Sequence, residues 1–498
     1  MAAQRNINAV SPLDGRYAGK LGSLNRAFGE GALARYRALV ECRYLEKLCA
    51  TPGVAIRGLN PSEKALLEKL PLLSDRDILE IIAIEETGSG RVPPTKHDVK
   101  AVEYFIKEKL RRSSLRDITE FVHFALTSED INNISYALML RDSLKAEIIP
   151  ALEEILAALD ALALKHAAAP LLARTHGQPA VPTTFGKEFR VFHARLLRQV
   201  RQLKAARICA KLNGASGNYN AHAAAFPGAD WPKFSKEFIE SFNSSSEAGF
   251  TPHFGPGSGK SAGYTPNFDP GTGKSAGPAL EYNPFTTQIE PHDSYAELFD
   301  NLRRANTILL AFCQDMWRYI SAGLVAQKAV AGEVGSSTMP QKVNPIHFEN
   351  AEGNLGLANA LLGFFSAKLP VSRLQRDLSD STVERNFGAA LGHGLAAYRS
   401  VLTGLSRAAV DEAAARAELE LHPEVLAEGI QTILRREGET GPYELLSKFT
   451  RGRAVTAAGL RKFIDGLKLK PAIKAELKRL SPLNYTGLSE KIAKRKEF

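Results

Sequence analysis

Apolar residues recur at helical spacing along most of this chain, and the alternation typical of strands is nearly absent. From Leu298 to Tyr319 they alternate at intervals of four and three residues, which is the spacing of a seam that packs against other helices. Ser294 and Glu297 form a capping-box pattern before this run. Because no proline interrupts the run, the sequence predicts one helix of about 30 residues.

Two further runs predict long helices. One begins near Leu152, with Pro150 tolerated in its first turn, and reaches His166; the other covers residues 187–212. Helices of this length can bury their seams only against equally long partners. We therefore expect an all-α fold built around an elongated bundle that other subunits complete.

One segment, residues 244–280, breaks the helical pattern because it is rich in Gly, Ser and Pro. It contains two similar copies, beginning at Thr251 and Thr265, and each copy carries Gly-Lys-Ser. A phosphate-binding P-loop needs a glycine five positions before the glycine of that triplet, where this chain has Phe254 and Phe268. We interpret the segment as a surface insertion rather than a nucleotide site.

Composition excludes several classes of protein. The 498 residues are 44% hydrophobic and 24% charged, which is typical of globular domains. No stretch approaches the ~18 consecutive apolar residues of a membrane helix, and the N-terminus lacks the apolar region of a secretory signal. The four cysteines form no CxxC pair, so we expect reduced thiols and a cytoplasmic location.

The formal net charge of +10 is concentrated at the C-terminus, where residues 461–498 hold eleven Lys and Arg against four Asp and Glu. Such a surface can attract nucleic acid or steer a small polyanionic substrate. The tail lacks the aromatic pattern that stacks on single strands, so nucleic-acid binding is the less favoured reading.

The stretch 332–354, GEVGSSTMPQKVNPIHFENAEGN, has the composition of a loop that closes over a ligand. A serine acts as a base only where a cation or aligned N–H groups stabilise its alkoxide, and Lys342 could supply that cation. Taken alone, a Ser/Gly-rich connector explains the stretch equally well.

Four other stretches carry polar groups that could hold an anion or move a proton. Each also has a structural explanation. The stretch from Arg174 to Pro182 around His176 could hold an exposed histidine, and Thr127 to Asp130 could be an ordinary helix cap. Lys96-His97-Asp98 could be a solvated pair, and the arginine-rich segment from Ser372 to Arg385 could be a charged helix face.

Together these stretches resemble one family. GSSTMPQKVNP is similar to the GSSxMPxKxNP signature of the fumarase/aspartase superfamily, and further motifs resemble the bacterial-type adenylosuccinate lyases within it. Those motifs are SPLDGRY (11–17), HDVKAVEYFIKEK (97–109), TSEDINN (127–133), RTHGQPAVPTTFGKE (174–188), GNYNAH (217–222), QIEPHDSYAELFD (288–300) and SRLQRDLSDSTVERN (372–386).

The resemblance implies a carbon–nitrogen lyase of purine nucleotide synthesis (AMP and IMP biosynthesis). It would eliminate fumarate from adenylosuccinate, giving AMP, and from the succinyl-carboxamide ribotide SAICAR, giving AICAR. No metal or cofactor is expected, and neither is a membrane or nucleic-acid partner. The implied architecture has three helical domains, at 1–116, 117–405 and 406–498. The central long-helix bundle would form the core of a homotetramer whose active sites are shared between chains.

The resemblance also implies roles for individual residues. Ser336 corresponds to the catalytic base, His176 to the general acid and Glu349 to the carboxylate that pairs with this histidine. Lys342 and Asn344 correspond to groups that bind the carboxylates and stabilise the carbanion. The remaining substrate-binding positions are Arg16, Tyr17, Lys96, His97, Asp98, Thr127, Ser128, Gln288, Arg376, Ser381 and Arg385.

Two departures and two alternatives accompany this hypothesis. Lys96 stands where relatives often have a neutral residue, and Gln341 replaces a frequent histidine, so affinity could differ while the reaction stays the same. Another lyase of the superfamily, acting on argininosuccinate or aspartate, is one alternative. The other is a non-catalytic helical scaffold or nucleic-acid binder, which would not need the base and acid that Ser336 and His176 provide.

Overall fold

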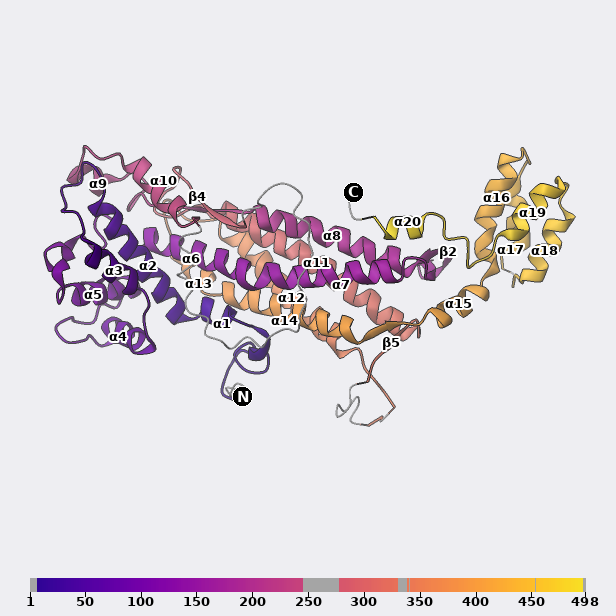
Figure 1. Cartoon of the computed structure of the whole chain (residues 1–498), viewed down its shortest axis with the longest axis horizontal. Coiled ribbons are helices and arrows are strands. Elements are labelled where there is room, and N and C mark those ends of the chain that lie inside the picture. Colours follow the sequence, from indigo (N-terminus) through magenta and orange to yellow (C-terminus); the bar gives the residue numbers. More distant parts are fainter. Residues whose placement is uncertain (1–6, 245–276, 330–337, 340, 453, 496–498) are drawn as a thin grey trace. The chain divides into compact units, whose positions relative to one another are not determined.

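The computed structural model describes residues 7–244, 277–329, 338–339, 341–452 and 454–495 and is mainly helical (Figure 1). The chain forms two compact units, each drawn from three stretches. The first unit comprises Met1–Leu152, Gln199–Thr307 and Gly353–Arg399; the second comprises Glu153–Arg198, Ile308–Glu352 and Ser400–Phe498. The predicted predominance of helix is confirmed.

The elements fall into three groups. The first unit holds η1 (Ala18–Lys20), α1 (Leu24–Ala27), α2 (Glu30–Cys49), α3 (Pro61–Lys69), α4 (Asp75–Glu86), α5 (Asp98–Leu110), η2 (Ser114–Phe121), α6 (Ser128–Ser143), the π turn η3 (Leu144–Ile148), β3 (Arg207–Ala210), α9 (Asn220–Ala225), α10 (Trp231–Ser241), β4 (Ala279–Tyr282) and α13 (Ser379–Glu384). The second holds β1 (Pro170–Thr175), β2 (Gln178–Thr184), β5 (Val325–Gln327), β6 (Ala408–Val410), α15 (Glu412–Glu420), η5 (Pro423–Leu426), α16 (Ala427–Arg436), α17 (Pro442–Thr450), α18 (Ala457–Gly466), α19 (Pro471–Arg479) and α20 (Ser489–Ala493). Five long helices contribute residues to both units: α7 (Ile149–Lys165), α8 (Phe185–Ala205), α11 (Asp293–Ser321), α12 (Ile346–Lys368) and α14 (Phe387–Arg407).

The predicted long helix near Leu298 is confirmed as α11, which has 29 residues. Its predicted N-terminal cap is wrong, because the helix already begins at Asp293. The hydroxyl of Ser294 instead accepts a hydrogen bond from the backbone N–H of Cys209, 2.9 Å away. The hydroxyl of Ser294 therefore connects α11 to strand β3 and does not cap the N-terminus of α11.

The helix predicted with Pro150 in its first turn is α7, which begins at Ile149, and it continues directly from the helical residues before it. Helix α6, the π turn η3 and helix α7 follow one another without a break from Ser128 to Lys165. A proline inside a helix has no N–H to donate and crowds the carbonyl one turn before it. The π turn directly before Pro150 changes the hydrogen-bonding register there, and this accommodates the ring.

The third predicted helix is α8, but it ends at Ala205 rather than near residue 212. Residues 207–210 form β3 instead, which pairs in parallel with β4 through Ile208 and Leu280. Ala279 and Leu280, which we assigned to the insertion, therefore belong to this sheet. The strands in the described residues have three to seven residues, which is too short to show a clear alternation of apolar and polar residues. Their three two-stranded sheets therefore could not be predicted from periodicity.

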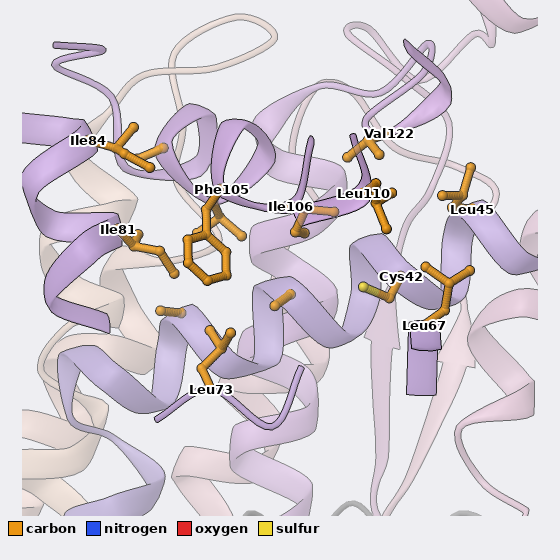
Figure 2. Close-up of a cluster of buried hydrophobic side chains, with 14 of the residues drawn as sticks. Cys42, Leu45, Leu67, Leu73, Ile81, Ile84, Phe105, Ile106, Leu110 and Val122 are labelled. Atoms are coloured by element: carbon orange, nitrogen blue, oxygen red, sulfur yellow. The ribbon is translucent and has the colours of Figure 1, made fainter. Parts of the chain in front are cut away.

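The core near the site lies in the first unit, where α2, α4 and α5 pack together (Figure 2). Ile78, Ile81 and Ile84 recur every three residues on one side of α4, and all three are buried. They meet a cluster that includes Phe105 of α5 and Cys42 of α2. This packing fixes the N-terminal end of α5 against α2, where the polar residues of the candidate site begin.

The second unit has its own apolar cluster, formed mainly by the C-terminal helices. Helices α16, α17, α18 and α19 lie together (Figure 1) and bury Ile430, Leu446 and Ile464. Leu172 of the β1–β2 hairpin joins the same cluster. Among the described helices, none combines the length and the apolarity needed to cross a membrane.

Most of the predicted insertion, residues 245–276, lies outside the described residues, but its flanks are held together. The side-chain amide of Asn243 donates to the carbonyl of Leu280 at 2.7 Å, and its oxygen accepts from the N–H of Leu280 at 2.9 Å. A short linker can therefore join the two flanks at little entropic cost.

We expect that replacing residues 246–276 with a short Gly-Ser linker leaves the activity that the resemblance implies within about twofold of the parent and keeps the thermal midpoint of unfolding. An enzyme assay measures the activity, and differential scanning fluorimetry measures the thermal midpoint. A variant that folds but has lost its activity would show that the segment takes part in the reaction.

Candidate active site

Asp98, the first residue of α5, joins three elements of the first unit. Its carboxylate accepts hydrogen bonds from Arg37 of α2 at 2.8 Å and from Arg385 at 2.9 Å. Arg37 is held in turn by Asn132 of α6 at 2.9 Å. Burial alone would raise the pKa of Asp98, but the guanidinium of Arg37 and the hydrogen bonds outweigh it and lower the pKa to about 2. Asp98 is therefore ionised and holds Arg385 beside the start of α5.

His97 connects the N-terminal ends of α5 and α6. Its Nδ1 accepts the backbone N–H of Lys100 at 3.3 Å, so His97 is the N-cap of α5. Its Nε2 lies 3.3 Å from the hydroxyl of Ser128. Because Nδ1 accepts, the neutral ring carries its proton on Nε2 and donates to Ser128. Thr127 is the N-cap of α6, which confirms the predicted polar helix start.

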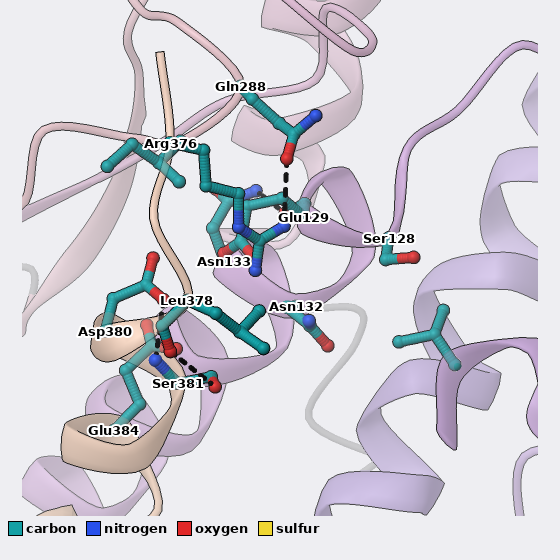
Figure 3. A network of polar contacts seen from close by, with 12 residues as sticks. Ser128, Glu129, Asn132, Asn133, Gln288, Arg376, Leu378, Asp380, Ser381 and Glu384 are labelled. Carbon is teal, nitrogen blue, oxygen red and sulfur yellow. Dashed lines mark hydrogen bonds and ion pairs between the residues drawn. The ribbon is translucent and has the colours of Figure 1, made fainter. Parts of the chain in front are cut away.

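Arg376 is the centre of a second group of contacts (Figure 3). One terminal nitrogen donates to the side-chain oxygen of Gln288 at 3.2 Å, and the other pairs with Glu129 at 3.0 Å. The amide of Gln288 donates to the carbonyl of Ala215 at 3.1 Å. Ser381, in α13, donates its hydroxyl to the carbonyl of Leu378 at 3.2 Å. Predicted residues from two separate motifs thus share one neighbourhood with Glu129 of a third motif.

A fully buried ion pair supports this neighbourhood. Lys211 and Asp130 lie 3.0 Å apart, and neither side chain has any exposed surface. Asp130 also accepts the backbone N–H of Thr127 at 2.9 Å, and Lys211 donates to the backbone carbonyls of Gly214 at 2.9 Å and Gln288 at 2.8 Å. Such a pair is tolerated because hydrogen bonds satisfy the buried charges. It holds the α6 N-terminus next to the Gln288 segment.

The remaining predicted positions of the first unit take other partners. The ammonium of Lys96 donates to the carbonyl of Glu86, 2.7 Å away at the end of α4, where the helix dipole favours a cation. Arg16 is exposed. Tyr17 is half-buried, and the Lys20 ammonium lies 5.8 Å from the centre of its ring.

His176 is at the tip of the β1–β2 hairpin in the second unit. Thr175 pairs with Gln178, so the loop consists of His176 and Gly177, whose φ angles are 54° and 75°. A two-residue hairpin favours positive φ at both loop positions, and histidine tolerates it better than most side chains. The predicted non-helical break is confirmed, and it exposes the imidazole on a turn.

The other predicted catalytic residues lie at and before the start of α12. Lys342 is exposed and Asn344 half-exposed in the non-helical stretch, and Glu349 lies in the first turn. The carboxylate of Glu349 accepts a hydrogen bond from the Trp317 indole at 3.1 Å. Its pairing with His176 stays a prediction. Ser336 lies outside the described residues.

Several residues of the network were not predicted. Arg37, Lys211 and Glu129 each hold a predicted residue or its segment in place. The signal for Lys211 is a charged residue inside an otherwise apolar run, which indicates a buried partner, whereas Arg37 has Arg35 two positions before it and carries no such signal. For Glu129, which sits inside the predicted TSED motif, the sequence gives no sign that it faces Arg376.

Removal of the Asp98 charge tests the first cluster. We expect Asp98→Asn to lower the free energy of unfolding at pH 7 by about 2–4 kcal/mol, because the nearly buried guanidinium of Arg37 loses its counter-ion. The pKa of Asp98 is depressed, so this contribution is present above the ordinary carboxyl pKa and is lost as the pH falls toward 2. Urea unfolding followed by circular dichroism measures it.

Asp75→Asn provides the control, since Asp75 pairs with Arg35 at 3.2 Å but is fully exposed. An exposed pair contributes about 1 kcal/mol at most. Equal losses in the two variants would contradict the role assigned to Asp98.

Comparison with known proteins places the chain in a family. The family model "Adenylosuccinate lyase C-terminal" matches residues 372–486, and the model "Lyase" matches residues 73–249 and 271–359. Adenylosuccinate lyase of Vibrio cholerae is 46% identical over 484 residues, with 97% of each chain covered. That of Escherichia coli K12 is 45% identical with 97% of each chain covered, and that of Dictyostelium discoideum is 42% identical with the same coverage.

Solved structures share the fold at lower identity. The 3-carboxy-cis,cis-muconate lactonizing enzyme of Pseudomonas putida aligns with a TM-score of 0.66 at 22% identity, covering 95% of both chains. A fumarate lyase from Mesorhizobium aligns with a TM-score of 0.63 at 16% identity, covering 95% of this chain and 96% of that one. Identity above 40% over nearly the full length, together with both family models, shows that this chain belongs to the adenylosuccinate lyase family.

Proposed function

We propose that this chain catalyses the reversible β-elimination of fumarate from adenylosuccinate, giving AMP, and from SAICAR, giving AICAR, in purine nucleotide synthesis. One observation carries the proposal beyond family membership. Six residues predicted separately as substrate-binding groups form three contacts: His97 with Ser128, Asp98 with Arg385, and Gln288 with Arg376. They come from four motifs that are far apart in the sequence.

The network suits a substrate that carries a phosphate and two carboxylates. Arg376 and Arg385 present planar guanidinium groups, which match the geometry of phosphate and carboxylate oxygens. Ser128 and Gln288 add neutral polar groups that can orient the ligand without adding charge. The contacts of Arg376 with the buried Glu129 and of Arg385 with Asp98 hold these two side chains in place before the substrate arrives, which reduces the entropic cost of binding.

The chemistry needs a base and an acid. Ser336 removes a proton from the succinyl carbon next to a carboxylate, and the resulting negative charge spreads onto that carboxylate. Lys342 and Asn344 bind the carboxylates and stabilise this charge, which is where fixed donors help most. His176 protonates the departing nitrogen, which is a poor leaving group unless it gains a proton. Glu349 pairs with the imidazole and keeps it oriented.

The active enzyme is a homotetramer in the cytoplasm, with each active site shared between chains. Helix α12 supports the oligomer, because apolar residues lie on its exposed side as well as on its buried side. Leu355 and Leu362 are buried, whereas Leu357 and Phe364 are each 54% exposed. A helix that is apolar all round usually lies in a core, so a second copy of the chain is the natural cover for this side.

Release of fumarate from four compounds in parallel tests the reaction. Purified enzyme is incubated with adenylosuccinate, SAICAR, argininosuccinate or aspartate, and fumarate is followed by its ultraviolet absorbance. We expect turnover of the first two only. Activity on argininosuccinate or aspartate alone would assign the chain to a different lyase reaction. Tight, salt-sensitive binding of DNA without any turnover would favour a nucleic-acid binder.

A further inference from the structure

A cluster of buried acids lies next to Arg376 (Figure 3). It consists of Glu129, Asp380 and Glu384, whose exposed fractions are 1%, 4% and 2%, with the fully buried ring of His292 beside them. We call these four residues the acid cluster. Carboxylates avoid the interior unless each has a partner, so a concentration of three of them needs an explanation.

The contacts of the acid cluster leave several polar atoms without a hydrogen bond. Glu129 uses Oε2 to pair with Arg376 at 3.0 Å, and Glu384 lies 3.5 Å from Nε2 of His292. Asp380 accepts the backbone N–H of Ser381 at 2.7 Å. Within the described residues, Oε1 of Glu129, Oδ2 of Asp380 and Nε of Arg376 are buried without a hydrogen-bond partner.

The cluster holds more negative than positive charge. The charged groups that face Glu129 are Arg376 from the segment before α13, Asp380 and Glu384 from α13, and His292 from the segment before α11. Another buried carboxylate, Glu290, accepts the backbone N–H of His292 at 2.6 Å. The acid cluster and Arg376 therefore hold three carboxylates against two cations, with Glu290 a fourth carboxylate next to His292, and a bound proton is the simplest way to reduce the excess of negative charge.

The pKa shifts agree with this geometry. Burial, with the neighbouring Glu384, raises the pKa of Glu129 to about 7, although Arg376 opposes the rise. Burial also raises the pKa of Asp380. For His292, burial lowers the pKa, but Glu384 outweighs burial and raises it to about 9, so the ring is an imidazolium near neutral pH.

We propose that the acid cluster takes up one proton from solvent when an anionic group of the substrate binds Arg376, and that the carboxyl of Glu129 carries it. This inference rests on the proposed function, since it takes Arg376 as a substrate-binding residue. The bound anion and an ionised Glu129 would both contact the guanidinium of Arg376, so two negative charges would lie close together and repel each other. Protonation of Glu129 removes the repulsion and leaves Arg376 to the ligand; the proton returns to solvent when the ligand leaves.

Glu129 is therefore a positioning residue with a titratable role. As the pH rises, its ionised form competes more strongly for Arg376, so anion binding weakens in the wild type. Removal of the charge removes this competition. A residue that only packed α6 against α13 would change stability but would not change the number of protons bound with the ligand.

Isothermal titration of the intact enzyme with AMP at pH 8.0 measures the proton directly. The observed heat in two buffers of different ionisation enthalpy gives the number of protons taken up per site. We expect about 0.5 to 1 more proton for wild type than for Glu129→Gln. At this pH the phosphate of AMP is a dianion, and the difference between the two proteins cancels any proton that the ligand or a histidine contributes.

Glu63→Gln is the matched control, because Glu63 is 2% exposed and also pairs with an arginine, Arg57, at 2.9 Å. This control should take up protons like the wild type. Equal uptake by Glu129→Gln and wild type, or no uptake by the wild type, would overturn the proposal even if the variant folds poorly. Fumarate release by the same preparation separates a failure of this inference from a failure of the proposed function. An enzyme that turns over adenylosuccinate but takes up no extra proton contradicts this inference alone. An enzyme that turns over adenylosuccinate but does not bind AMP also contradicts this inference alone.

Discussion

Ser336→Ala is expected to lower kcat for adenylosuccinate by about 10³- to 10⁴-fold while the affinity for the substrate changes little. A methyl group cannot accept the proton of the succinyl carbon, so the first chemical step loses its base. Arg376 and Arg385, which belong to other segments, are unchanged, and Lys342 and Asn344, further along the same stretch, keep the side chains that bind the carboxylates. Initial rates of fumarate release give kcat, and isothermal titration of the inactive variant with adenylosuccinate gives the affinity.

Ser337→Ala is the control for this experiment. It makes the same chemical change one residue further along the sequence, and the resemblance gives this second serine no role in proton transfer. We expect it to retain most of the activity. If Ser336→Ala kept a near-normal kcat, or if the two variants lost activity equally, the base would be a different group.

The long helices could be predicted because their apolar residues repeat over many turns. The start of α11 could not be located as well, since Ser294 is used in a tertiary contact with Cys209 that competes with its capping role. Pro150 illustrates a second limit. A local rule correctly placed it in the first turn of α7, but it did not predict the π turn that joins α7 to α6 without a break. Strands β3 and β4 depend on pairing between residues about 70 positions apart, which no local pattern encodes.

The site shows the same division. Residues inside ordered motifs, such as His97 and Arg376, could be predicted as substrate-binding groups from the family resemblance, and their roles stay predictions. Their supporting partners are single charged residues in buried surroundings, and only the fold reveals which residue each one meets. Lys211 holds Gln288 through a backbone carbonyl, a contact that any residue type at position 288 would offer. Such contacts do not depend on the residue type at the partner position, so they cannot be predicted from the sequence there.

His176→Asn is expected to lower kcat by about 10²- to 10⁴-fold without disturbing the hairpin. The position needs a positive φ angle, 54° in this structure, and asparagine adopts that region more readily than most residues. The substitution therefore keeps the turn between β1 and β2 but removes the imidazole. An amide cannot donate a proton to a departing nitrogen as an imidazolium does, so the elimination stops at the leaving-group step.

His422→Asn makes the same exchange elsewhere in the second unit, where the ring pairs with Glu424 at 2.7 Å. This control should keep a normal kcat. Initial rates between pH 6 and 9 measure both variants against the wild type, with scanning fluorimetry to compare their thermal midpoints. A His176→Asn variant that kept a near-normal kcat would assign the acid to another residue.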